Sequence, residues 1–153
     1  LMEMRAFTLT DYAQLHPGGQ LGKRLIMTVA DAMLKGDDNP MINISDSMKH
    51  CILEISNKQT GVVSVVNNDG KLLGLVTDYD IRKHLEKEEN IFSMKIEEIM
   101  NSKPISIYDD EKAFSALQIM QEREKPITVL PVINRKDVVI GILRLQDLVK
   151  VGL

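Results

Sequence analysis

Apolar residues recur with a helical period at two places along the chain. Residues spaced at i, i+3, i+4 and i+7 lie on one face of a helix. Two sets have this spacing: Met48, Cys51, Ile52 and Ile55 in the first half of the chain, and Ala113, Ala116, Leu117 and Met120 in the second. The pattern therefore predicts one amphipathic helix in each half.

Short apolar runs typical of strands lie on both sides of each predicted helix. One run precedes the helix, over residues 41–44 (MINI) and 104–107 (PISI). Two more follow it in close succession, over 62–67 and 71–77 in the first half and as VLPVIN and VVIGIL in the second. The residues between the first pair, 68–70 (NDG), favour a tight hairpin. We expect the order strand, helix, strand, strand in each half.

Further helices are expected at both ends of each half. One follows each hairpin, from Asp78 to about Glu86 and from Leu145 to about Val151. A short helical turn opens each half, over residues 29–34 and 96–100. The stretch 86–95 is polar and mixed in charge, which is typical of a connector between the halves.

The two halves form an internal duplication with an offset of 67 residues. Four identical pairs share this offset: Met33 and Met100, Asn67 and Asn134, Gly74 and Gly141, and Asp80 and Asp147. Between these pairs the register shifts and then returns, as insertions in surface loops would make it do. A half of about 60 residues buries little surface alone, so we expect the two halves to pack against each other.

Composition limits the classes of protein and partner. The chain has 153 residues, of which 44% are hydrophobic and 27% charged, as in globular proteins. Its net charge of -3, with Lys and Arg spread along the chain, argues against nucleic acid and membrane partners. No apolar run approaches the roughly 18 residues of a membrane span. The single cysteine, Cys51, excludes an internal disulfide and has no partner at metal-ligand spacing. We expect a soluble, cytoplasmic protein without a metal site.

The duplicated pattern, closed in each half by GLVTDYDI at 74–81 and GILRLQDL at 141–148, resembles a tandem pair of CBS domains. Such pairs, called Bateman modules, are regulatory parts of many enzymes. The resemblance divides the chain into a first CBS domain over 28–90 and a second over 91–153. It implies an α+β fold with pseudo-two-fold symmetry, in which each half is a small mixed β-sheet packed against two helices. It also implies clefts between the halves suited to adenosine-type nucleotides, and a homodimer.

The segment before this pair narrows the resemblance. Residues 5–26 (RAFTLTDYAQLHPGGQLGKRLI) are similar to the linker that joins a sugar isomerase (SIS) domain to the CBS pair in the arabinose-5-phosphate isomerase family. These enzymes interconvert ribulose 5-phosphate and arabinose 5-phosphate on the route to the Kdo sugar of bacterial lipopolysaccharide. The resemblance assigns residues 1–27 to this linker and implies an SIS domain missing from this chain. We therefore expect a C-terminal fragment that is not itself an enzyme.

His16 allows two interpretations. In the resemblance, the histidine of HPGG lies near the isomerase active site of the full-length enzyme. It is there a candidate for proton transfer, because imidazole titrates near neutral pH. The alternative is an exposed loop histidine followed by a Pro-Gly turn. For this fragment alone the second interpretation is favoured, and no catalytic residue is expected.

Thr77 and Asp80 lie where a predicted strand meets a predicted helix. A carboxylate accepts hydrogen bonds from ribose hydroxyls, a threonine hydroxyl donates or accepts, and amides at a helix start attract anions. The adenine of a nucleotide would then rest on nearby apolar residues: Met41, Ile42, Val62 and Val63. Alternatively, Thr77 and Asp80 form a capping box, which contributes about 1 kcal/mol and needs no ligand. Both interpretations remain open.

The second half departs from this pattern. Arg144 stands in place of the threonine, and Asp147 follows three positions later, so the two side chains can pair on the helix. An arginine here would crowd a ribose, but it could reach a phosphate bound at the first position. We therefore expect only the cleft at Thr77 and Asp80 to bind a nucleotide.

Two functions remain. The chain either senses a ligand such as AMP, ADP, ATP or CMP-Kdo and regulates an isomerase, or binds no ligand and only holds subunits together. An independent enzyme is the weakest interpretation, because no nucleophile, base and orienting partner cluster in the sequence. No cofactor is expected to be required.

Overall fold

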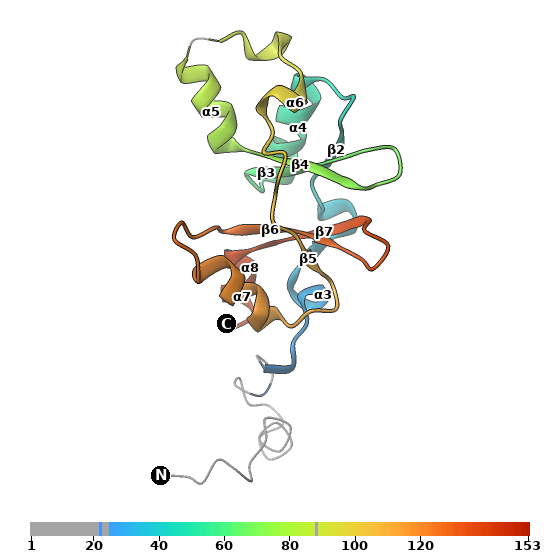
Figure 1. Ribbon diagram of the computed structural model, residues 1–153, viewed down its shortest axis with the longest axis vertical. Coiled ribbons are helices and arrows are strands. Elements are labelled where there is room, and N and C mark those ends of the chain that lie inside the picture. The colour runs from blue at the N-terminus through green and yellow to red at the C-terminus, as the bar shows by residue number, and fades with distance from the viewer. Residues whose placement is uncertain (1–21, 23–24, 88) are drawn as a thin grey trace.

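The computed structural model describes residues 22, 25–87 and 89–153. Figure 1 shows two halves stacked along the long axis, with their sheets facing each other and their helices on the outer sides. This confirms the expected α+β architecture of two small mixed sheets. No helix of these residues has the length and apolar character needed to cross a membrane.

The first sheet has the strand order β2-β3-β4. The middle strand runs parallel to β2 and antiparallel to β4. Two helices follow the predicted pattern, one between β2 and β3 and one after β4. The bounds are β2 (Met41–Asn43), α4 (Met48–Lys58), β3 (Val62–Val66), β4 (Leu72–Thr77) and α5 (Asp78–Glu86). The hydrophobic periodicity thus predicted this half correctly.

The second sheet has the order β1-β7-β6-β5. Its elements are β1 (Leu34–Lys35), β5 (Ile107–Tyr108), α7 (Ala113–Gln121), β6 (Val129–Ile133), β7 (Val139–Arg144) and α8 (Leu145–Lys150). The strand predicted over 104–107 was wrong except at its last residue. In the first half the amide of Ser64 donates to the carbonyl of Pro40 and extends the ladder. Pro131 takes the place of Ser64 and has no amide hydrogen to donate, so the second ladder starts later.

The segments that open the two halves are exchanged between them. The early strand β1 pairs with β7 of the second half, with Leu34 opposite Ile142. Reciprocally, Asn101 pairs with Leu75 of the first half, through amide-to-carbonyl distances of 3.0 and 2.8 Å. Each sheet is therefore completed by a short segment from the other side of the connector.

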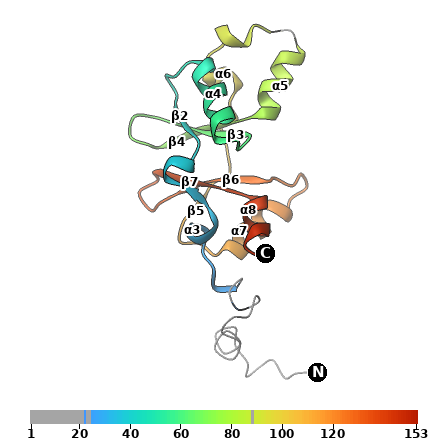
Figure 2. The same cartoon turned by 180° about the vertical axis from the view of Figure 1, so that it is seen from behind.

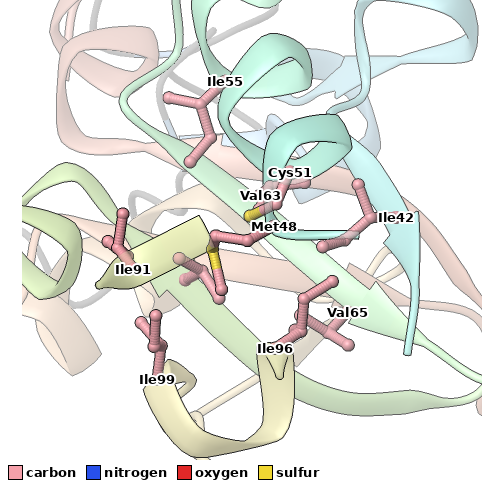
Figure 3. Close-up of a cluster of buried hydrophobic side chains, with 10 residues drawn as sticks. Ile42, Met48, Cys51, Ile55, Val63, Val65, Ile91, Ile96 and Ile99 are labelled. Carbon is pink, nitrogen blue, oxygen red and sulfur yellow. The ribbon is translucent and has the colours of Figure 1, made fainter. Parts of the chain in front are cut away.

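The short opening helices are exchanged in the same way. They are α3 (Val29–Ala32) and α6 (Ile96–Ile99), and the connector contributes the 3-10 turn η2 (Ile91–Ser93). Val29 is buried in the core of the second half. Ile91, Ile96 and Ile99 pack with Met48 in the core of the first half, as Figure 3 shows. The connector was predicted as a polar stretch, but Ile91 is only 2% exposed and anchors it.

The two sheets meet through a third apolar cluster. Val62 and Leu75 of the first sheet pack with Ile142 of the second, and all three are buried. Every residue of β3 is buried because one face of this strand lies against α4 and the other against the second half. The predicted packing of the two halves against each other is confirmed.

Residues 1–21, 23–24 and 88 lie outside the described residues. They include His16 and most of the predicted linker, 1–27. The proposed role of His16 in a full-length enzyme therefore stays a prediction.

Candidate functional site

Thr77 and Asp80 form a capping box at the junction of β4 and α5. Oδ2 of Asp80 accepts hydrogen bonds from the amide and the hydroxyl of Thr77, both at 2.9 Å. The amide of Asp80 donates to the Thr77 hydroxyl at 3.2 Å. The predicted cap is thus confirmed. Within the described part of the chain, Oδ1 of Asp80 accepts no hydrogen bond and remains able to accept one from a ligand.

The same two residues line a cavity of about 630 Å³ between the halves, here called the Asp80 cavity. Most of its apolar wall comes from the second half and includes Pro104, Ile105 and Ile127, with Pro126 and Val129 beside them, and Leu75 of the first half adds to it. Pro104 and Ile105 follow Asn101, whose backbone is hydrogen-bonded to β4. The exchange of opening segments therefore brings this wall beside Asp80.

Three cations also line the Asp80 cavity. Lys103 lies on the loop before β5, and Arg123 and Lys125 lie on the loop after α7. Asp80 is the one carboxylate among the lining residues. The cavity therefore combines one acceptor, an apolar wall and an excess of positive charge, which suits an anionic ligand with a polar ring and a flat apolar group.

A larger cavity, of about 890 Å³, lies where the starts of α5 and α8 meet. We call it the central cavity. Arg82, Arg144 and Lys150 line it, with Asp78 as the one carboxylate of the lining. Thr77 lines both cavities, so the two spaces adjoin at the end of β4.

The predicted pairing of Arg144 with Asp147 is confirmed. Nε of Arg144 donates to Oδ2 of Asp147 at 3.0 Å, and Nη2 donates to Oδ1 at 2.7 Å. The backbone amide of Arg144 also donates to Oδ2, at 2.9 Å. The side chains are only 16% and 7% exposed. Both oxygens of Asp147 are thus occupied, and Asp147 lines neither cavity.

The apolar residues expected around an adenine lie elsewhere. Ile42 and Val63 are 2% and 0% exposed and belong to the core under α4 (Figure 3). Met41 lines neither cavity, whereas Val62 lines the central one. Alternate residues of a strand face opposite sides, so Val62 faces the second half and Val63 the helix.

The residues of the actual apolar wall were not identified from the sequence. Pro104 and Ile105 belong to a run predicted as a strand, and Ile127 follows a polar loop. Their closeness to Asp80 depends on the exchange of segments, which periodicity alone does not reveal. The two Pro-Ile pairs at 104–105 and 126–127 were the available signal.

Cys51 has a structural role. Its side chain is fully buried in α4, and burial, with a smaller contribution from Asp46, raises its pKa to about 12. A thiol with this pKa is protonated and unreactive at neutral pH. In the described part of the chain, no group of three His, Cys, Asp or Glu side chains could hold a metal ion.

The CBS domain profile matches residues 29–87 and 96–153. The chain belongs to the CBS domain family. Among solved structures, it is similar to the CBS domain pair of protein MJ0100 in complex with 5'-methylthioadenosine and S-adenosyl-L-methionine, at 25% identity and a TM-score of 0.71, over 82% of this chain and 94% of that one. CBSX2 in complex with AMP has the same fold, at 23% identity and a TM-score of 0.68, over 81% and 94%.

Curated relatives extend the likeness to the whole chain. It is 37% identical over 153 residues to arabinose 5-phosphate isomerase KdsD of Francisella tularensis, which covers 100% of this chain and 46% of the relative. Identity to the KdsD of Pseudomonas aeruginosa is 33% over 152 residues, covering 99% and 46%. The chain therefore spans about half the length of these relatives, and the predicted resemblance to the isomerase family is confirmed.

Proposed function

We propose that this CBS pair is the regulatory part of an arabinose-5-phosphate isomerase, and that the Asp80 cavity senses an adenosine-type nucleotide or a sugar nucleotide. The parent protein would carry an SIS domain, work in the cytoplasm and interconvert ribulose 5-phosphate and arabinose 5-phosphate. The identity to KdsD enzymes over the full chain supports this assignment. We expect this CBS pair alone to have no isomerase activity.

The observation that carries the proposal is the set of groups in the Asp80 cavity. Oδ1 of Asp80 is available to a ribose hydroxyl, while Oδ2 is held by Thr77. Ile105 and Ile127 offer an apolar surface to the base. Lys103 and the loop cations attract the phosphate. The same carboxylate can thus cap α5 and bind a ligand, and the two interpretations of Asp80 do not exclude each other.

The corresponding position in the second half is proposed to bind no nucleotide. Arg144 occupies the place of Thr77, and its guanidinium takes both oxygens of Asp147. The segment matching the loop before β5 contains the turn η1 (Gly36–Asp38), in which Gly36 stands in place of Lys103 and Asp37 and Asp38 follow it. Two carboxylates there would repel an anion. We therefore expect one nucleotide per chain.

We also propose that the protein is a homodimer. Figures 1 and 2 show α5 and α8 on the same side of the molecule. Large apolar side chains are exposed on these two helices: Tyr79 and Leu85 on α5 and Val149 on α8, at 62%, 52% and 61%. A second copy would remove this surface from water. Sedimentation at several concentrations tests the dimer, and a monomer at all of them would refute it.

A melting screen tests the proposed ligand. AMP, ADP, ATP, CMP and CMP-Kdo are added in turn, because a bound ligand raises the melting temperature by mass action. We expect at least one of them to stabilise the wild type and to lose its effect in Asp80→Ala. Asp31→Ala is the matched control, because Asp31 caps α3 on Thr28 in the same way and lines neither cavity. If none of the five stabilises the wild type, the ligand-free interaction module is the better account.

A further inference from the structure

We propose that a nucleotide bound in the Asp80 cavity restrains residues 27–30, and that β5 and α7 carry the restraint from the cavity to them. Residues 27–30, here called the entry segment, join the predicted linker to α3. This inference rests on the proposed function and deepens it, because it names the route by which the nucleotide would act on the proposed SIS domain.

The entry segment is bound to the loop between β5 and α7, in the second half. The amide of Val29 donates to the carbonyl oxygen of Glu111 at 2.8 Å. The amide of Ala30 donates to the carbonyl oxygen of Asp109 at 3.0 Å. The Val29 side chain is fully buried in the core of the second half. The entry segment precedes the first half in the sequence, but these contacts make it move with the second.

The strand β5 joins this loop to the wall of the Asp80 cavity. Pro104 and Ile105 line the cavity just before the strand. Only three residues separate Ile105 from Asp109, which accepts the hydrogen bond of Ala30. Ile107 between them is buried and paired with β6. A ligand that restrains Ile105 therefore also restrains the loop that holds the entry segment.

The helix α7 makes the second connection. Arg123 and Ile127, on the loop after this helix, line the Asp80 cavity, and the amide of Ile127 donates to the carbonyl oxygen of Met120 at 3.0 Å. At the other end of α7, the amide of Ala113 donates to the carbonyl oxygen of Met27 at 2.9 Å. Both Met120 and Ala113 are fully buried. The helix is about 14 Å long and packed into the core, so it links the cavity to the entry segment as a rigid element.

Arg135 is the positioning residue of this connection. Its guanidinium lies 3.9 Å from the ring centre of Tyr108, the last residue of β5, and bonds to both carboxylate oxygens of Asp110 at 2.8 and 2.9 Å. In the first half Asn68 takes its place, and its Oδ1 accepts from Nδ2 of Asn43, the last residue of β2, at 2.8 Å. The two hairpins thus brace equivalent loops, but the entry segment is bound to the loop that Arg135 braces.

Amide hydrogen exchange of the chain, with and without nucleotide, tests this inference. The probe is AMP or, where AMP does not raise the melting temperature, whichever of ADP, ATP, CMP and CMP-Kdo raises it most. We expect the nucleotide to slow exchange at Val29 and Ala30 by at least about fivefold, as coupling between separate sites does. The amide of Asp46, bonded to the carbonyl oxygen of Asn43 in the loop after β2 at 2.9 Å, should stay nearly unchanged. Stabilisation of the whole fold alone would slow all of these amides alike.

Two variants show whether the restraint passes through the braced loop. Arg135→Ala should still bind the nucleotide but lose most of the slowing at Val29 and Ala30. Asn68→Ala is the matched control and should keep both, because Arg135 and Asn68 are exposed and both variants are expected to fold. Equal slowing at Asp46, no slowing at Val29 and Ala30, or full slowing in Arg135→Ala would overturn the inference and leave the proposed function standing. Absence of binding by all five compounds would overturn both.

Discussion

Gly74 lies directly beneath the side chain of Met100. A Cβ atom at position 74 would clash with Sδ of Met100 and would lie 2.9 Å from the carbonyl oxygen of Asn101. The second half repeats the contact, with Gly141 beneath Met33 and a Cβ there 2.7 Å from the carbonyl oxygen of Leu34. The glycine of each half is thus required by the exchanged segment of the other.

Substitution of this glycine should therefore destabilise the whole module. Gly74→Ala forces the backbone of Asn101 away and is expected to lower the free energy of unfolding by about 2–3 kcal/mol. Gly36→Ala is the control, because a Cβ at Gly36 meets nothing within 4 Å. Its positive φ of 59° should cost only about 1 kcal/mol. Chemical denaturation measures both, and equal losses would contradict the account.

The buried pair of Arg144 and Asp147 should matter more than an exposed pair of equal geometry. Arg144→Ala leaves the carboxylate of Asp147 buried without its ion-pair partner, which should cost about 3 kcal/mol. Arg135 forms the comparable fork on Asp110, at 2.8 and 2.9 Å, but these side chains are 60% and 53% exposed. Arg135→Ala should change stability far less. Denaturant unfolding measures the loss of unfolding free energy in both variants. A larger loss for Arg135→Ala than for Arg144→Ala would refute this ranking.

The stability that the cap of α3 contributes should depend on pH. Hydrogen bonds from the amide and hydroxyl of Thr28 hold the pKa of Asp31 below its usual range. A lowered folded-state pKa means that the cap stabilises fully above the unfolded pKa and is lost as the pH falls through the folded one. The difference in unfolding free energy between wild type and Asp31→Ala should be constant from pH 7 to about 5 and shrink below about pH 4. A difference that grows with acid would contradict this assignment.

Cys51 should report the opening of the first half. Because its thiol is fully buried and its pKa is raised to about 12, a thiol reagent at pH 8 should modify the native protein only through unfolding. The rate of thiol modification is expected to rise with denaturant concentration, and to be higher in Gly74→Ala than in the wild type. Rapid modification of the native wild type would show that α4 does not cover this residue as described.

The four identical pairs of the repeat were visible in the sequence, and each has a structural cause. Oδ1 of Asn67 accepts from the amides of Asp69 and Lys71, at 2.9 and 3.0 Å, which closes the first hairpin. Oδ1 of Asn134 closes the second hairpin in the same way, at 2.9 and 3.1 Å. The aspartate pair caps α5 and α8. Local contacts of this kind could be predicted because all partners lie within four residues.

The contacts between pairs could not be predicted. The 67-residue offset identified two pairs of equivalent positions, the methionines 33 and 100 and the glycines 74 and 141. It did not reveal that each glycine contacts the methionine of the opposite half. The same exchange brings Ile105 and Ile127, and not Ile42 and Val63, toward Asp80. These contacts join residues about 25 to 110 positions apart. The closure of such long loops leaves no pattern in the sequence near either residue.

The most direct test of the central claim is the number of nucleotides bound per chain, measured calorimetrically with the best ligand of the melting screen. The account predicts one bound nucleotide per chain for the wild type and for Asp31→Ala, and no bound nucleotide for Asp80→Ala. Two equal sites in the wild type, or unchanged binding by Asp80→Ala, would contradict it.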